Sequence, residues 1–315
     1  MFYKELIIGL VSTVGILTGA EIVIRVARDL CRKFNFSEYY VGLTILSIGT
    51  SLPEIFTHIF GSIHILSGSY DYEKLSGIVI GTNIGSNIVQ ISLITGLVAM
   101  FAVIHTTKKF LRTDYLFMLV VIFMLGVIGF DGEFSRLDGS LLFFGYMAYL
   151  YRLSVNEHVF VKIHRCKNLF SYIVKMCFGF LILAISSNYL LKSAVFLTDY
   201  LSLEGTFFGV LILGFLTVIP EFTTAIIGIK NGLKEIPLFV LVGSNITNPM
   251  MGIGIGALIS KYHVSHEILA IDLPAWFFIS LIGFVFATWS LKLSRLGACL
   301  LFSSYFIFVF FRILS

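Results

Sequence analysis

The chain has 315 residues, of which 57% are apolar and only 13% are charged, and its mean hydropathy is +0.96. Soluble globular domains carry about 25% charged residues, so this composition excludes a soluble domain and predicts an integral membrane protein. The formal net charge of +4 is better explained by membrane topology than by a nucleic-acid partner.

Apolar runs of about 20 residues, the length that an α-helix needs to cross a bilayer, recur along the whole chain. The first run lacks the short apolar core and small-residue cleavage site of a signal peptide, so we expect it to be a retained span. We predict an all-α integral membrane protein with ten transmembrane helices, at about residues 5–27, 39–66, 75–101, 113–130, 136–153, 170–197, 204–229, 235–260, 265–288 and 293–313.

Lysine and arginine are distributed unevenly between the two sets of loops. The connections that follow odd-numbered spans hold fifteen of these side chains, and the opposite side holds six. Positive charge collects in cytoplasmic loops. We therefore expect the odd-numbered loops in the cytoplasm and both termini outside, in a multi-pass protein of the cell membrane.

The longest and most basic connection separates two groups of five spans. We predict a first five-helix repeat at residues 1–153, a basic cytoplasmic linker at 154–169 and a second five-helix repeat at 170–315. Because five is odd, the second group enters the membrane in the opposite sense from the first. Two inverted repeats of this kind are typical of secondary transporters.

Two motifs recur in order in the two halves. The second span contains "GTSLPE", ending at Glu54, and the seventh contains "FLTVIPEF", in which Glu221 also follows a proline. One span later, "GSNIVQ" at residues 85–90 matches "GSNITN" at residues 243–248. Matched motifs at equivalent spans indicate an inverted duplication.

Both prolines are expected to interrupt their helices. A proline has no backbone N–H, so the carbonyl four residues earlier, that of Gly49 or Leu216, loses its helical partner. Free carbonyls in a bilayer are tolerated only where they line a cavity or meet a ligand. The two breaks therefore predict a ligand site near the centre of the membrane.

Polar side chains lie one helical turn apart on the same faces of these spans. With the freed carbonyls they form a set of oxygen atoms, which hard cations such as Ca²⁺ and Na⁺ prefer, whereas zinc or copper would favour histidine and cysteine. The pairs are Thr50 with Glu54, Ser86 with Gln90, Thr217 with Glu221, and Ser244 with Asn248.

A carboxylate at the centre of a membrane helix costs roughly 2.5–3.5 kcal/mol on insertion scales. An ion pair with lysine or arginine is one structural explanation for such a residue. However, no basic residue lies between the ends of spans two, three, seven and eight. The sequence therefore favours a bound cation as the partner of Glu54 and Glu221.

"GTSLPE" followed by "GSN" in the first half, with "PE" followed by "GSN" in the second, resembles the α-1 and α-2 repeats of the Ca²⁺/cation antiporter superfamily, most closely its prokaryotic sodium/calcium exchanger branch. The resemblance covers nearly the whole chain. It implies four central ion sites, a sliding gate formed by the first and sixth spans, and a monomer. The ion ligands that it implies are Thr50, Ser51, Glu54, Ser86, Thr217, Glu221 and Ser244.

The sequence departs from that pattern at three ligand positions. Val218 stands where the family has a serine, Asn248 where sodium/calcium exchangers usually carry an aspartate, and Gln90 where Asn or Asp is common. Glu54 and Glu221 then supply at most two negative charges, which neutralise one Ca²⁺, two monovalent cations or two protons. Three Na⁺ would leave uncompensated charge in a low dielectric.

We therefore predict a secondary active antiporter that exchanges Ca²⁺ for Na⁺ by alternating access, with fewer than three Na⁺ per cycle. The alternatives are exchange of Ca²⁺, or of another divalent or monovalent cation, for H⁺, and a cation channel. No HExxH zinc motif or serine–histidine arrangement occurs, so an enzyme is not expected. We expect no cofactor apart from the transported ions, Ca²⁺ and Na⁺ or H⁺.

His58 lies one helical turn beyond Glu54. It could titrate near the site or bind a softer metal such as Mn²⁺ or Zn²⁺; the alternative is a histidine that is simply hydrogen-bonded near the membrane boundary. Glu21, Asp114 and Asp272 are interpreted as polar groups at helix ends or in packing contacts, with a role in the mobile gate as the alternative for Glu21.

Overall fold

The computed structural model describes residues 2–34, 36–156 and 169–314. In the first half, the π-helical turns η1, η2 and η3 interrupt longer α-helices. The elements are α1 (Phe2–Phe34), α2 (Glu38–Val41), η1 (Gly42–Leu46), α3 (Ser47–Thr50), α4 (Leu52–Leu66), α5 (Tyr72–Val89), η2 (Gln90–Ile94), α6 (Thr95–Phe101), α7 (Lys108–Phe110), η3 (Leu111–Tyr115), α8 (Leu116–Ile128), β1 (Glu133–Phe134) and α9 (Arg136–Asn156).

The second half repeats this alternation of α-helices and π-helical turns. Its elements are α11 (Leu169–Tyr200), α12 (Gly205–Phe208), η5 (Gly209–Leu213), α13 (Gly214–Thr217), α14 (Ile219–Lys230), α15 (Ile236–Thr247), η6 (Asn248–Ile253), α16 (Gly254–Ile259), β2 (Tyr262–His263), η7 (Ile268–Asp272), α17 (Leu273–Ser290) and α18 (Arg295–Leu314). Residues 157–168 of the predicted linker lie outside the described residues.

Among the described residues, eight helical segments are long and apolar enough to cross a membrane, and a ninth span is formed by two helices bent by 44° at Ser51. These segments coincide with nine of the ten predicted spans. The remaining one is α9, which does not meet the same criterion. The prediction of an all-α, multi-pass membrane protein is confirmed, and the tenth crossing stays a prediction.

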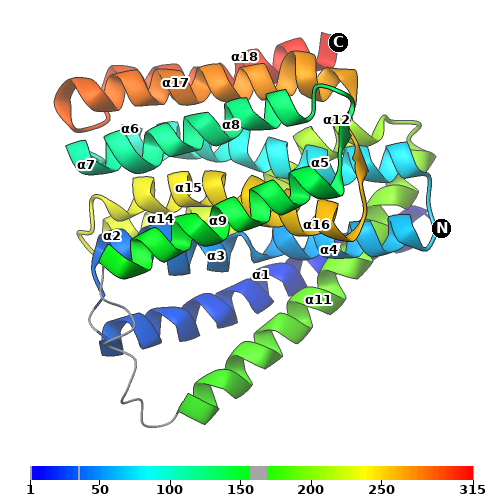
Figure 1. Ribbon diagram of the computed structural model, residues 1–315, viewed down its shortest axis with the longest axis horizontal. Coiled ribbons are helices and arrows are strands. Elements are labelled where there is room, and N and C mark those ends of the chain that lie inside the picture. The colour runs from blue at the N-terminus through cyan, green and yellow to red at the C-terminus, as the bar shows by residue number, and fades with distance from the viewer. Residues whose placement is uncertain (1, 35, 157–168, 315) are drawn as a thin grey trace.

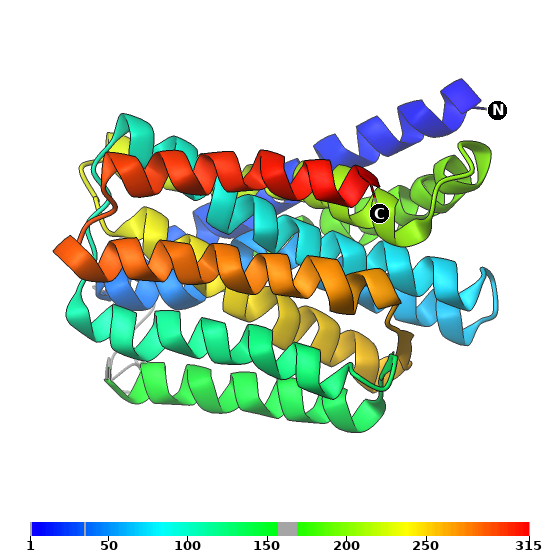
Figure 2. The same cartoon turned by 90° about the horizontal axis from the view of Figure 1, so that it is seen from above.

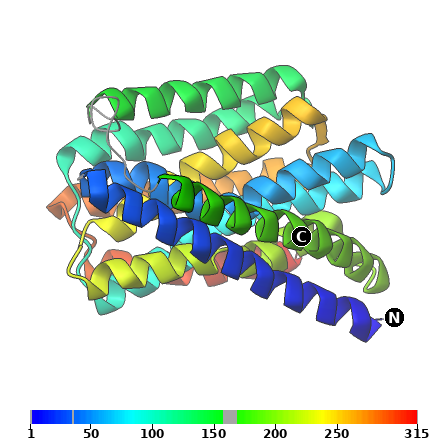
Figure 3. The ribbon, with the colours of Figure 1, turned by 90° about the horizontal axis from the view of Figure 1, so that it is seen from below.

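The helices form a layered bundle (Figure 1). α17 and α18 lie at one edge, in front in Figure 2, and α1 crosses α11 at the opposite edge, in front in Figure 3. In the apolar segments of α1 and α11 only 33% and 17% of residues are buried, against 78% for α5 with η2 and α6 and 89% for α15 with η6 and α16. The spans that carry the repeated "GSN" motifs therefore form the centre of the protein.

Loops that were predicted for the same face do meet one another. At one end, His105 and Thr106 donate backbone hydrogen bonds to the carbonyls of Lys234 and Leu291, which joins loops three, seven and nine. At the other end, β1 pairs antiparallel with β2, joining loops four and eight. The two ends of the bundle thus hold the two predicted sets of loops.

Each acid-bearing span is broken by one residue. Ser51 separates α3 from α4 with φ/ψ of −78°/−2°, and Val218 separates α13 from α14 with −83°/1°. Pro53 and Pro220 lie in the first turn of the helix that follows, where a backbone N–H has no helical partner in any case. The predicted helix breaks are confirmed.

Three pairs of π-helical turns occur at equivalent places in the two halves. η1 and η5 precede the breaks, η2 and η6 follow the "GSN" motifs, and η3 and η7 begin spans four and nine. π-Helical turns are uncommon in proteins, and those that occur are often found at functional sites. Their occurrence at equivalent positions supports an internal duplication.

α5 approaches the seventh span so closely that backbone meets backbone. A Cβ atom added to Gly85 would lie 2.1 Å from the carbonyl oxygen of Val210, and one added to Gly214 would lie 2.7 Å from the amide nitrogen of Ser86. Small residues at helix interfaces permit such contacts in membranes. They hold the end of α13, at Thr217, against the "GSN" segment of α5.

Two ion pairs, each with a fully buried aspartate, occupy equivalent places in the halves. Asp114 in η3 pairs with Arg152 in α9 at 2.8 Å, and Asp272 in η7 pairs with Arg312 in α18 at 3.2 Å. The two aspartates have the same spacing in the sequence as Ser86 and Ser244. Each pair ties span four or nine to the span that follows it, so the interpretation of Asp114 and Asp272 as packing groups is confirmed.

Arg152→Met is expected to lower the free energy of unfolding by roughly 1–3 kcal/mol, because it leaves the Asp114 carboxylate without its cation. The loss is limited because Tyr39, Thr113 and Tyr149 also donate to that carboxylate. Thermal unfolding in detergent measures the effect. The exposed Arg112 is a matched control, and equal melting temperatures for Arg152→Met and Arg112→Met would contradict the prediction.

Candidate functional site

The nine predicted ion ligands come together in the centre of the bundle. Four spans supply them: the second and seventh around their breaks, and the third and eighth at the ends of α5 and α15 and the first residues of η2 and η6. None is more than 2% exposed, although each has a polar or charged side chain. These residues are Thr50, Ser51, Glu54, Ser86, Gln90, Thr217, Glu221, Ser244 and Asn248.

The two carboxylates, one from each half of the chain, interact with each other. Glu54 lies beside the hydroxyls of Thr217 and Ser86. Glu221 lies beside the hydroxyl of Thr50 and is close enough to Glu54 for the two charges to repel. Among the described residues, none of the four carboxylate oxygens has a hydrogen-bond partner of normal geometry. A buried carboxylate without a hydrogen-bond partner is stabilised by a bound cation or by a proton.

Hydroxyl groups around the carboxylates have their protons engaged elsewhere. Ser86 donates to the Asn83 carbonyl at 2.8 Å, Thr50 to that of Ser47 at 3.2 Å and Thr217 to that of Gly214 at 3.4 Å. A hydroxyl that donates to the backbone keeps its lone pairs for other partners. Ser86 and Thr217 are thus oriented as acceptors, which suits a cation. The hydroxyl of Thr50 also lies 3.1 Å from that of Ser244, and either of these two can donate.

Buried amides that the sequence analysis did not single out surround the predicted ligands. Asn83, Asn87 and Asn245 are fully buried. Asn87 accepts from the amide nitrogen of Asn248 at 2.9 Å, and Asn245 donates to Oε1 of Gln90 at 2.9 Å. The available signal was the third letter of each "GSN" motif, which is Asn87 or Asn245.

His58 is buried beside this group of amides and is 1% exposed. Its Nε2 lies 3.0 Å from Nδ2 of Asn83, and its Nδ1 lies 3.2 Å from the hydroxyl of Tyr262 in β2. Both ring nitrogens thus have neutral partners. Among the described residues, no cluster of three or more His, Cys, Asp or Glu side chains could hold a metal ion, which does not favour the reading of His58 as a ligand for a softer metal.

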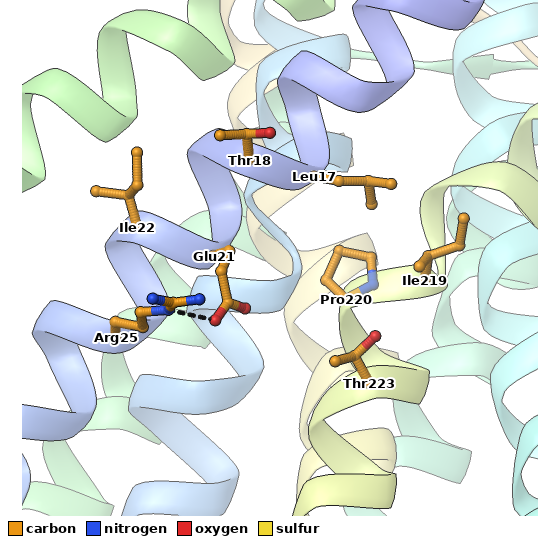
Figure 4. A pocket seen from close by; sticks show the side chains of 8 residues that line it. All are labelled: Leu17, Thr18, Glu21, Ile22, Arg25, Ile219, Pro220 and Thr223. Carbon is orange, nitrogen blue, oxygen red and sulfur yellow. Dashed lines mark hydrogen bonds and ion pairs between the residues drawn. The ribbon is translucent and has the colours of Figure 1, made fainter.

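An open cavity of about 580 Å³ separates α1 from α14 (Figure 4). Pro220, the residue before Glu221, lies in its wall. On the α1 side, Glu21 pairs with Arg25 at 2.6 Å. The cavity therefore reaches from the peripheral helix α1 to the break that carries one of the two central acids.

Two broken helices with unpaired acids at the centre of a membrane protein are typical of secondary transporters of cations. The chain matches the family described as sodium/calcium exchanger protein over residues 4–155 and 171–314, and it belongs to that family. The family is one of transporters and not of enzymes.

Several known proteins are similar along nearly their whole length. The inner membrane protein YrbG of Escherichia coli is 27% identical over 88% of this chain and 86% of its own. The sodium/calcium exchanger MaX1 of Methanosarcina acetivorans is 26% identical over 93% and 94%. A solved structure of the sodium-calcium exchanger NCX_Mj superposes with a TM-score of 0.70 at 25% identity, covering 98% of each chain.

Proposed function

We propose that this protein is a cation antiporter that exchanges Ca²⁺ for Na⁺ by alternating access at the Glu54–Glu221 site. The observation that carries the proposal is the pair of fully buried carboxylates whose oxygens have no hydrogen-bond partner among the described residues. Hydroxyls oriented as acceptors complete an oxygen cage of the type that Ca²⁺ prefers. The sodium/calcium exchangers MaX1 and NCX_Mj, which resemble this chain, support Ca²⁺ and Na⁺ as the exchanged ions.

The negative charge of the site limits the number of cations that can be exchanged per cycle. Glu54 and Glu221 together carry at most two negative charges, which one Ca²⁺ or two monovalent cations neutralise. A third Na⁺ would be an uncompensated charge in a site that excludes water. Two monovalent ions per Ca²⁺ follow, and H⁺ is the alternative counter-ion because a proton also neutralises a buried carboxylate.

The proposal extends to the arrangement of the protein in the membrane. Residues 1–153 and 170–315 form two inverted repeats around a cytoplasmic linker at 154–169, with both termini outside the cell membrane and the protein acting as a monomer in the bilayer. α1 and α11 form the gate. The repeated breaks and π-helical turns support the duplication, and the low burial of α1 and α11 suits helices that slide.

Purified protein in liposomes tests the proposed ion coupling. Ca²⁺ uptake is expected when Na⁺ is loaded inside and absent outside, and uptake should stop when the Na⁺ gradient is removed. A pH gradient imposed in place of the Na⁺ gradient tests H⁺ as the alternative counter-ion. Ca²⁺ uptake driven by the pH gradient alone would identify H⁺ as the counter-ion. Ca²⁺ uptake down its own gradient with neither counter-ion present would contradict antiport and favour a channel.

A further inference from the structure

The side-chain amides of Gln90 and Asn248 occupy equivalent places in the two halves, but a different kind of atom is left without a hydrogen bond in each. Gln90 begins η2 and Asn248 begins η6, and both are fully buried. Within the described part of the chain, the side-chain atom left without a hydrogen bond is Nε2 in Gln90 and Oδ1 in Asn248. One is a donor, which repels a cation, and the other is an acceptor, which binds one. Amide orientation is decided by the hydrogen-bond network, and here each network has an unambiguous anchor.

The anchor for Gln90 is Trp276 in α17. An indole N–H can only donate, and Nε1 of Trp276 lies 2.8 Å from Oδ1 of Asn245. Asn245 must then turn its amide nitrogen the other way, to the Leu241 carbonyl at 2.8 Å and to Oε1 of Gln90 at 2.9 Å. The oxygen of Gln90 is therefore engaged, and its nitrogen is the free group.

The anchor for Asn248 is its own backbone. A carbonyl can only accept, and Nδ2 of Asn83 donates to the main-chain oxygen of Asn248 at 2.7 Å. Oδ1 of Asn83 then accepts from Asn87 at 3.2 Å, and Oδ1 of Asn87 accepts from Nδ2 of Asn248 at 2.9 Å. The nitrogen of Asn248 is engaged, and its oxygen is the free group.

The same chain of hydrogen bonds fixes His58. The second N–H of Asn83 is directed to Nε2 of His58 at 3.0 Å, so Nε2 accepts and the ring proton lies on Nδ1, facing the Tyr262 oxygen. The Tyr262 hydroxyl donates to the backbone carbonyl of His58 at 3.0 Å. His58 thus acts as a neutral acceptor that holds Asn83 in place.

The turns that begin with the two amides pack against the helices that carry the two acids. η2 packs against α14, which carries Glu221, and η6 packs against α4, which carries Glu54. We propose that Gln90 directs an amide N–H to the Glu221 side of the site while Asn248 directs an amide oxygen to the Glu54 side. The cation then binds on the Asn248 side, and Gln90 is a specificity-determining residue that takes the place of a cation. Trp276 and Asn245 are its positioning residues.

This inference deepens the proposed Ca²⁺ exchange and rests on it. It also gives Gln90 a different role from that of an oxygen ligand, which the sequence analysis assigned to it. A donor in the site reduces the number of positions open to cations, in agreement with the two negative charges available.

The matched pair Gln90→Met and Asn248→Leu tests the proposal, because each change removes one buried amide of the same pseudo-symmetric pair. Ca²⁺ binding to the purified protein is measured by calorimetry, with thermal unfolding to compare folding. Asn248→Leu is expected to weaken Ca²⁺ binding by at least about tenfold, and Gln90→Met by less than about threefold. Equal weakening by the two changes would overturn the proposal.

A second variant changes Trp276, which positions Asn245 and Gln90, and leaves the residues of the site unchanged. Trp276→Phe removes the indole N–H, which leaves the Leu241 carbonyl to hold Asn245. The reversed arrangement, in which Gln90 presents its oxygen, should then be more populated. Ca²⁺ binding is then expected to tighten by about threefold or more, whereas the exposed Trp289→Phe should leave it unchanged. Unchanged or weaker binding in Trp276→Phe overturns the proposal. Failure of the wild-type protein itself to bind Ca²⁺ would instead overturn the proposed exchange function.

Discussion

Replacing Glu54 by glutamine is expected to reduce Ca²⁺ exchange by at least about 100-fold, which corresponds to about 2.7 kcal/mol. Two unit charges 4 Å apart interact by about 4 kcal/mol at an effective dielectric constant near 20, and a divalent cation gains more. The amide keeps the size of the side chain and removes this attraction. Glu221→Gln should cause a loss of similar size, because the two acids face the same site.

The melting temperatures of the variants distinguish a loss of ion binding from misfolding. Glu54 and Glu221 are buried and repel one another, so neutralising either one should leave the melting temperature unchanged or raise it. Glu73→Gln, on the exposed first turn of α5, is the matched control and should exchange Ca²⁺ at the wild-type rate within about twofold. A Glu54→Gln protein that keeps half of the wild-type exchange rate would refute the role of the carboxylate. Radioactive Ca²⁺ uptake into liposomes measures all three variants.

Gly85→Ala is expected to destabilise the protein by about 2 kcal/mol or more and to lower its melting temperature by roughly 5 °C. The added methyl group would lie 2.1 Å from the carbonyl oxygen and 2.6 Å from the Cα atom of Val210. Both are backbone atoms, so no change of side-chain rotamer relieves the clash. η5, which contains Val210, must move away together with α13, which follows it. This separates Thr217 from Glu54, and Ca²⁺ exchange should fall as well.

Gly126→Ala provides the control for Gly85→Ala. Gly126 lies in the interior of α8, and a Cβ atom there would meet nothing within 4 Å among the described residues. Alanine is the better helix former, so this change should leave the melting temperature the same or slightly higher. Thermal unfolding in detergent compares the two variants. If both lowered the melting temperature equally, the close contact of α5 with the seventh span would not be important for stability.

Local covalent rules made the broken helices predictable. A proline has no N–H, and the sequence places Pro53 and Pro220 directly before the two acids. Both lie in the first turn after a one-residue break. Hydropathy likewise predicted the nine spans that the described residues bear out, because each is decided by its own residues. α9 was harder to judge because it mixes apolar side chains with Arg136, Asp138 and Arg152.

The network of amides could not be predicted, because its contacts join spans that are distant in the sequence. Asn83 was unremarked although its side chain meets His58 and Asn248, and Trp276 lay in a span with no motif. Even the polarity of Gln90 depends on an indole from α17. Residue types predicted an oxygen site, but which amide atom faces it depends on packing that periodicity does not reveal.

His58 illustrates the same limit. Its position one turn after Glu54 suggested a titrating group or a metal ligand, with a hydrogen-bonded histidine as the alternative. In the structure both ring nitrogens have neutral partners, in agreement with the alternative.

The dependence of Ca²⁺ exchange on membrane voltage tests the central claim, a site with two negative charges that carries one Ca²⁺ or two monovalent cations. Each unbalanced charge that crosses 100 mV changes the free energy by about 2.3 kcal/mol, or about 50-fold in the equilibrium gradient. With liposomes clamped by K⁺ and valinomycin, we expect the same Ca²⁺ gradient at equilibrium at zero and at about −100 mV, and no transport current. A gradient that follows the voltage, with a current during exchange, would contradict the account.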